Sequence, residues 1–84
     1  MMRYTLSRHA QEMLARRAIR LEWLERALGD PMRTERDRMD PALEHRLAPI
    51  VEQGGRVLRV IVNPAIDPLV VVTVYFDRRE RSGP

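Results

Sequence analysis

The apolar residues of the N-terminal third recur at helical spacing. Ser7 is a good helix N-cap, and Ala10, Met13 and Leu14 follow it on one face of a helix. This pattern predicts a first helix over residues 7–17. Its apolar stripe must pack against the rest of the fold, because a helix of this length gains most of its stability from such packing.

A second amphipathic segment predicts a helix over residues 21–28. Its apolar face consists of Trp23, Leu24, Ala27 and Leu28. Gly29 and Pro31 follow directly, and a glycine with a proline after it commonly ends a helix. Two short helices joined by a turn around Ile19 are therefore expected.

The rest of the chain favours strands, because its apolar residues are largely β-branched and partly alternate with polar ones. The expected strands cover residues 32–38, 43–47, 56–62 and 69–76, with a short leading strand over residues 3–6. Helices followed by strands indicate an α+β domain with an antiparallel sheet of three to four strands. We expect a single domain over residues 1–84, with both helices on one face of the sheet and a charged tail over residues 77–84 that frays.

Strand parity predicts which side chains face the helices. The expected core face consists of Leu58, Val60, Val62, Val70, Val72, Val74 and Phe76. The opposite face, which we call the helix-free face, then carries Arg59, Thr73 and Tyr75. The same parity places Val57, Ile61 and Val71 there, which makes the face partly apolar and suggests a partner protein.

All 15 basic residues of this 84-residue chain are arginine, and the net charge is +3. A GC-rich coding sequence explains the bias most simply, but each guanidinium is also a planar fork suited to bidentate phosphate contact. The chain has no cysteine and only two histidines, so we expect no metal site. It lacks a membrane-spanning apolar run and a signal-peptide core, which favours a cytoplasmic protein without membrane contact.

His9 is the first candidate for chemistry, because histidine changes charge near neutral pH. His9, Met13 and Arg16 lie at i, i+4 and i+7, so an imidazole and a fixed cation share one stripe of the first helix. The competing interpretation of His9 is a residue that forms local hydrogen bonds at the helix start and packs on the sheet edge.

Several short motifs occur in a fixed order along nearly the whole chain. They are Tyr4-Thr5-Leu6-Ser7-x-His9-Ala10, Arg16-Arg17-x-Ile19 and Ala27-Leu28-x-Asp30-Pro31, followed by the strand sequences at residues 56–62 and 70–75. Together they resemble a small bacterial family known as domain of unknown function 4258. That family is similar to RelE/ParE-like toxins and, more broadly, to ribonucleases of the barnase, EndoU and colicin type.

The resemblance implies two helices packed on a curved antiparallel sheet, with active-site positions on the first helix and the later strands. The family's helix histidine corresponds to His9, its next arginine to Arg16 or Arg17, and its last-strand hydroxyl to Thr73, with Tyr75 beside it. Ala18 departs from the family, which often has glycine at this position. The departure concerns the turn rather than the chemistry.

The resemblance favours a metal-independent endoribonuclease, the toxin of a toxin–antitoxin pair, that acts without a cofactor. In this interpretation His9 transfers a proton, Arg59 and Arg16 or Arg17 hold the phosphate, and Thr73 or Tyr75 orients it or relays a proton. We expect His9, Arg59 and Thr73 to converge at one concave site. Arg17, His45 and Arg46 are the further candidates for contacts with RNA phosphates.

The partners expected from this interpretation are RNA, including ribosome-associated mRNA, and an antitoxin bound to the helix-free face. The alternative function is a non-catalytic binding domain of the same fold that acts through protein contacts, as a ParE-like or degenerate toxin would. The individual residues also have plainer interpretations. Arg59 suits a cross-strand ion pair, and Thr73 and Tyr75 suit ordinary strand positions.

Overall fold

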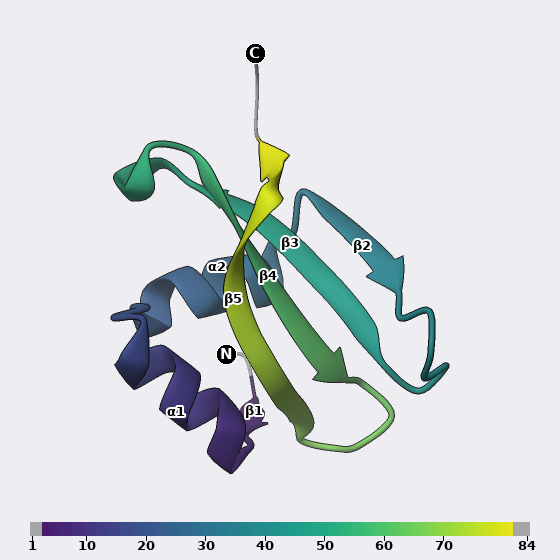
Figure 1. The fold of residues 1–84 in the computed structure, drawn as a ribbon. Coiled ribbons are helices and arrows are strands. Elements are labelled where there is room, and N and C mark those ends of the chain that lie inside the picture. The colour runs from purple at the N-terminus through teal and green to yellow at the C-terminus, as the bar shows by residue number, and fades with distance from the viewer. Residues whose placement is uncertain (1–2, 82–84) are drawn as a thin grey trace.

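The computed structural model describes residues 3–81 as an α+β fold with one five-stranded sheet (Figure 1). The elements are β1 (Tyr4–Leu6), α1 (Arg8–Arg16), α2 (Leu21–Gly29), β2 (Arg33–Arg36), β3 (Glu44–Ile50), the short 3₁₀ helix η1 (Val51–Gln53), β4 (Arg56–Asn63) and β5 (Leu69–Arg81). The strand order is β1-β5-β4-β3-β2. Both predicted helices are confirmed, and the predicted segments for all five strands contain a strand.

The sheet is mixed, so the expectation of three to four purely antiparallel strands is wrong. β1 pairs with the start of β5 in parallel, whereas the β2–β3, β3–β4 and β4–β5 pairs are antiparallel. The parallel pair joins segments from opposite ends of the chain. No turn signal connects them, and three residues are too few to specify a partner by alternation.

Both helices pack on the same face of the sheet (Figure 1). α1 lies on β5 and β1, and α2 lies on β4 and β3. Their buried residues are Ala10, Leu14, Trp23, Leu24, Ala27 and Leu28, which pack with Leu58, Val60 and Val62 of β4. The predicted helix faces and the predicted core face of β4 are therefore confirmed. Within residues 3–81, no helix is long and apolar enough to cross a membrane.

The predicted core face of β5 is wrong at its first half, because a β-bulge interrupts the alternation. Thr73 pairs with Ile61 but Val71 pairs with Val62, so Val72 is an extra residue without a partner in β4. Val71 is consequently fully buried in the core, while Val72 is only partly buried. Parity resumes after the bulge, as predicted, with Val74 buried and Thr73 on the helix-free side.

Ser7 attaches the start of α1 to this bulge. Its backbone N–H donates to the Val71 carbonyl at 3.0 Å, and its hydroxyl donates to the Val72 carbonyl at 2.8 Å. The same hydroxyl accepts from the Ala10 N–H at 3.0 Å, which is the predicted N-cap bond. One side chain therefore fixes both the helix start and its position on β5.

The segment over residues 77–81, expected to fray, continues β5 to Arg81. Residues 82–84 lie outside the described part of the chain. Arg33 in β2 forms an ion pair with Glu80 in β5 at 2.6 Å, although β3 and β4 lie between these strands. The end of β5 thus closes over the helix-free face, where Leu47 and Val57 are fully buried.

Replacing Ser7 with alanine should lower the free energy of unfolding by about 1–2 kcal/mol, because the variant loses an N-cap and leaves a part-buried carbonyl without its donor. Urea unfolding at neutral pH measures this change. Ser7→Thr keeps a hydroxyl and should lose less. Equal stability of Ser7→Ala and the wild type would show that the bulge and the helix start are held by other contacts.

Candidate functional site

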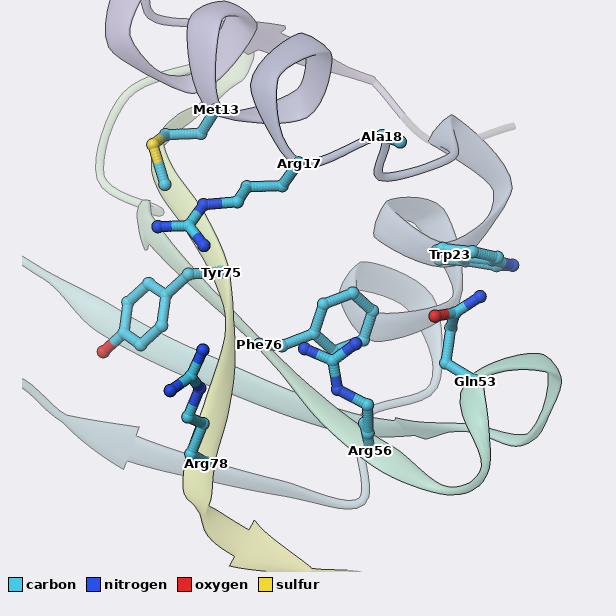
Figure 2. A pocket seen from close by; sticks show the side chains of 9 residues that line it. All are labelled: Met13, Arg17, Ala18, Trp23, Gln53, Arg56, Tyr75, Phe76 and Arg78. Atoms are coloured by element: carbon cyan, nitrogen blue, oxygen red, sulfur yellow. The ribbon is translucent and has the colours of Figure 1, made fainter.

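A cleft of about 800 Å³ lies beside β5, between the helices and the η1–β4 turn (Figure 2). We call it the basic cleft. The side chains that line it are Met13, Arg17, Ala18, Trp23, Gln53, Arg56, Tyr75, Phe76 and Arg78. Three of these are arginines and none is a carboxylate.

The three cleft arginines differ from the six arginines of the described chain that form ion pairs. Arg17, Arg56 and Arg78 are exposed, and within residues 3–81 none of them is in an ion pair. The arginines that do pair with carboxylates are Arg20, Arg26, Arg33, Arg46, Arg59 and Arg79. The basic cleft therefore concentrates positive charge that the described carboxylates leave uncompensated.

Arg17 reaches the cleft because of the turn that ends α1. Ala18 has φ 52, in the left-handed region, and its N–H donates to the Ala15 carbonyl at 3.3 Å. The Ile19 N–H donates to the Leu14 carbonyl at 2.9 Å, which completes a Schellman motif. This conformation explains why a glycine would suit position 18. It buries Ile19 in the core and leaves Arg17 at the rim of the basic cleft.

Arg56 is held by stacking rather than by an ion pair. Its guanidinium carbon lies 4.3 Å from the centroid of the Phe76 ring, a cation–π contact. Phe76 in turn contacts Trp23 edge-on, with ring centroids 6.2 Å apart. The planar cation is thus the outermost layer of a stack that begins in the core (Figure 2).

A second hollow, of about 510 Å³, lies on the helix-free face, and a connected set of charged groups occupies its floor. Arg59 donates from Nε to Asp77 at 2.8 Å, and from Nη1 to Glu35 at 3.0 Å and to His45 Nδ1 at 2.8 Å. Because a guanidinium only donates, the His45 ring carries its proton on Nε2, which bonds Asp37 at 2.6 Å. We call these five residues the Arg59 network.

The carboxylates of the Arg59 network are held in their charged form. Burial raises the pKa of Asp77, but the Arg79 backbone N–H and the Arg59 guanidinium outweigh it, so the pKa lies below the ordinary 3.8. Hydrogen bonds from His45 and from the Asp40 and Met39 backbone lower the pKa of Asp37. Arg59 is consequently neutralised at pH 7, and its Nε and Nη1 groups are bound to protein side chains rather than to a phosphate.

The structure brings together only part of the predicted site. Arg17 and Tyr75 meet in the basic cleft, and Tyr75 also borders the Arg59 network. His9 and Arg16 are exposed on α1, and neither they nor Thr73 line either hollow.

The expected convergence of His9, Arg59 and Thr73 is therefore wrong. Arg59 lies on the helix-free face, whereas α1, which carries His9, covers the opposite face.

The other predicted phosphate contacts have structural partners. His45 belongs to the Arg59 network. Arg46 donates to Glu44 at 2.6 Å and to the Leu28 carbonyl at 3.1 Å near the end of α2. The predicted apolar patch is also absent, because Val57 and Val71 are fully buried, the latter on the core side.

Sequence reasoning missed Arg56, Arg78 and Gln53 in the basic cleft. Arg56 and Gln53 flank the Gly54–Gly55 turn, and Arg78 lies in the segment that was expected to fray. Phe76 was assigned correctly to the core side, but its role in stacking with Arg56 depends on a contact between different strands. The charge run over residues 78–81 was the one available signal.

Replacing Arg59 with methionine should lower the free energy of unfolding by about 3–5 kcal/mol, because Asp77 then stays buried without its cation. The double variant Arg59→Met/Asp77→Asn should recover part of that loss. Arg79→Met is the matched control, since its side chain is 84% exposed and should cost less than about 0.5 kcal/mol. Denaturant unfolding of these proteins and of the single variant Asp77→Asn decides; strictly additive losses would contradict the coupling.

The stability of the wild type should fall as the pH drops below about 4–5. The pKa of Asp77 is lower in the folded chain than in the unfolded one, so the unfolded state binds more protons and acid favours it. Asp77→Asn should start from a lower stability but show a shallower acid dependence. Thermal unfolding of both proteins between pH 7 and pH 2 measures this, and parallel curves would refute it.

Comparison with known proteins identifies the family but supplies no function. No curated protein and no solved structure matches the chain. Residues 6–76, which include α1, α2 and most of the sheet, match the family model described as Domain of unknown function (DUF4258). Because this match spans far more than half of the sequence, the chain belongs to the DUF4258 family.

Proposed function

We propose that the basic cleft binds single-stranded RNA and that the protein is a toxin-like endoribonuclease that acts in the cytoplasm without a metal ion. The observation that carries the proposal is the gathering of Arg17, Arg56 and Arg78, without a carboxylate, around Tyr75 and Phe76. Uncompensated guanidinium groups bind phosphates, and aromatic or guanidinium planes stack with unpaired bases.

The shape of the cleft favours a single strand over a duplex. Its cations and rings come from the turn after α1, from α2, from the start of β4 and from β5, and they surround one hollow rather than following a helix face or a flat surface. A strand with splayed bases can place its phosphates and bases in such a hollow, whereas a duplex keeps its bases stacked inside.

Cleavage of the bound strand would use the 2′-hydroxyl of RNA as the nucleophile. The 2′-oxygen attacks the adjacent phosphorus, its proton passes to water, and the 5′-oxygen leaves. Arg17 and Arg78 flank Tyr75 and would stabilise the charge on the phosphorane, while the Tyr75 hydroxyl would protonate the leaving oxygen (Figure 2). This assigns to Arg17 the phosphate role expected from the sequence.

One observation favours a second function, RNA binding without cleavage. Within the described part of the chain, the lining of the basic cleft contains neither a histidine nor a carboxylate that could act as a general base. A toxin would also require an antitoxin. In the hollow of the helix-free face such a partner would contact the charged side chains of Arg36, Arg38 and Arg79 rather than an apolar patch.

The proposal predicts that Arg17→Ala weakens binding of a fluorescent single-stranded RNA and reduces its dependence on salt. Each lost phosphate contact should lower the slope of log affinity against log salt by about 0.7. If the RNA is cleaved, Arg17→Ala should slow cleavage on the order of 100-fold, and Tyr75→Phe should slow it without a comparable loss of binding. Fluorescence anisotropy and gel analysis of the RNA, with and without EDTA, measure both effects.

Arg16→Ala and His9→Ala are the controls, because both residues are exposed on α1 and lie outside the cleft. Both variants should bind RNA as the wild type does. Intact RNA with normal binding would leave the non-catalytic function. Absence of RNA binding by the wild type, or an equal loss in Arg16→Ala and Arg17→Ala, would refute the proposal.

A further inference from the structure

One end of the basic cleft carries hydrogen-bonding groups that a phosphate site does not need. Gln53 is half-buried there, and within residues 3–81 its amide has no hydrogen-bond partner. The Trp23 indole N–H likewise has no partner in this part of the chain, although only 6% of the residue is exposed. No buried side-chain nitrogen or oxygen among the described residues lacks a partner, so this N–H is open to solvent. Figure 2 shows the two groups at the same end of the cleft.

The Gln53 amide is not required by the turn on which it lies. Backbone bonds close that turn, from the Gly54 N–H to the Val51 carbonyl and from the Gly55 N–H to the Ile50 carbonyl, both at 3.0 Å. Gly54 supplies the left-handed residue, with φ 68. The Gln53 side chain is therefore not needed to hold the turn and is available to a ligand in the cleft.

The Arg56 guanidinium provides a flat surface next to this amide. One of its faces lies on the Phe76 ring at 4.3 Å, and the residue as a whole is exposed. A guanidinium plane stacks with nucleobases as an aromatic ring does, which an ammonium group cannot do. Because Phe76 packs on Trp23, the plane is held in position before a ligand arrives.

We infer that the Gln53 end of the basic cleft is a nucleobase subsite, in which an unstacked RNA base lies on Arg56 and forms hydrogen bonds through its edge with the Gln53 amide. An amide carries a donor and an acceptor side by side, which matches the paired groups on a base edge. The inference rests on the proposed binding of RNA and adds a division of tasks. Arg17 and Arg78 contact phosphates, whereas Gln53 and Arg56 recognise a base.

The test compares two ligands of equal length and charge: a short single-stranded RNA and a ribose-phosphate strand that lacks bases. Anisotropy should show that the wild type binds the RNA roughly tenfold more tightly than the abasic strand. Gln53→Ala and Arg56→Lys should each reduce that preference severalfold while keeping the affinity for the abasic strand. Arg17→Ala should weaken binding of both strands in parallel.

Val51→Ala is the matched control, because Val51 lies in the same turn, is 79% exposed and does not line the cleft. It should retain the preference, and unfolding curves verify that every variant is folded. Equal affinity of the wild type for the two strands overturns the subsite and leaves the proposed RNA binding intact. A preference that survives in both Gln53→Ala and Arg56→Lys also overturns it. Failure of the wild type to bind either strand overturns the subsite and the proposed function together.

Discussion

The buried guanidinium of Arg59 is the constraint around which the sheet is arranged. A cation that is only 6% exposed must be paired, because an isolated buried charge costs far more free energy than a small domain can offset. Asp77 in β5 and Glu35 in β2 neutralise it, and His45 in β3 accepts its third hydrogen bond. Four strands therefore contribute to one cluster. A shift of β4 by one residue in its pairing would turn Arg59 toward the helices. The cluster therefore also disfavours incorrect strand registers.

Ion pairing also leaves the charge unevenly distributed over the molecule. Carboxylates on or beside the helix-free face pair with Arg33, Arg59 and Arg79, and Glu52 pairs with Arg26 at 2.9 Å. Among the described residues, the lining of the basic cleft includes three guanidinium groups and no acidic side chain. The net charge of +3 is modest, but the positive charge in the basic cleft is locally higher. A phosphate chain can bind these guanidinium groups at short range even where salt screens the more distant charges.

Local patterns predicted the local parts of the structure. The stripes of α1 and α2, the Ser7 cap and the alternation of β4 all follow from neighbouring residues, and each is present. The parallel pairing of β1 with β5 and the bulge at Val72 were not predictable in the same way. Both depend on contacts between segments that are distant in the sequence. A run of valines has the same sequence pattern whether the strand is regular or bulged.

The candidate site was harder to predict than the fold, because residue type carries little information in a chain whose basic residues are all arginine. The same side chain serves as a buried, carboxylate-bound fork at Arg59, as a plane stacked on an aromatic ring at Arg56, and as an exposed cation at Arg17. Parity correctly placed Arg59 opposite the helices, but it could not show that carboxylates already occupy its donors. Which arginine is available to a phosphate depends on the distribution of twelve acidic residues in space. That distribution, rather than the position of any single arginine or histidine in the sequence, moves the candidate site from the helix-free face to the edge of β5.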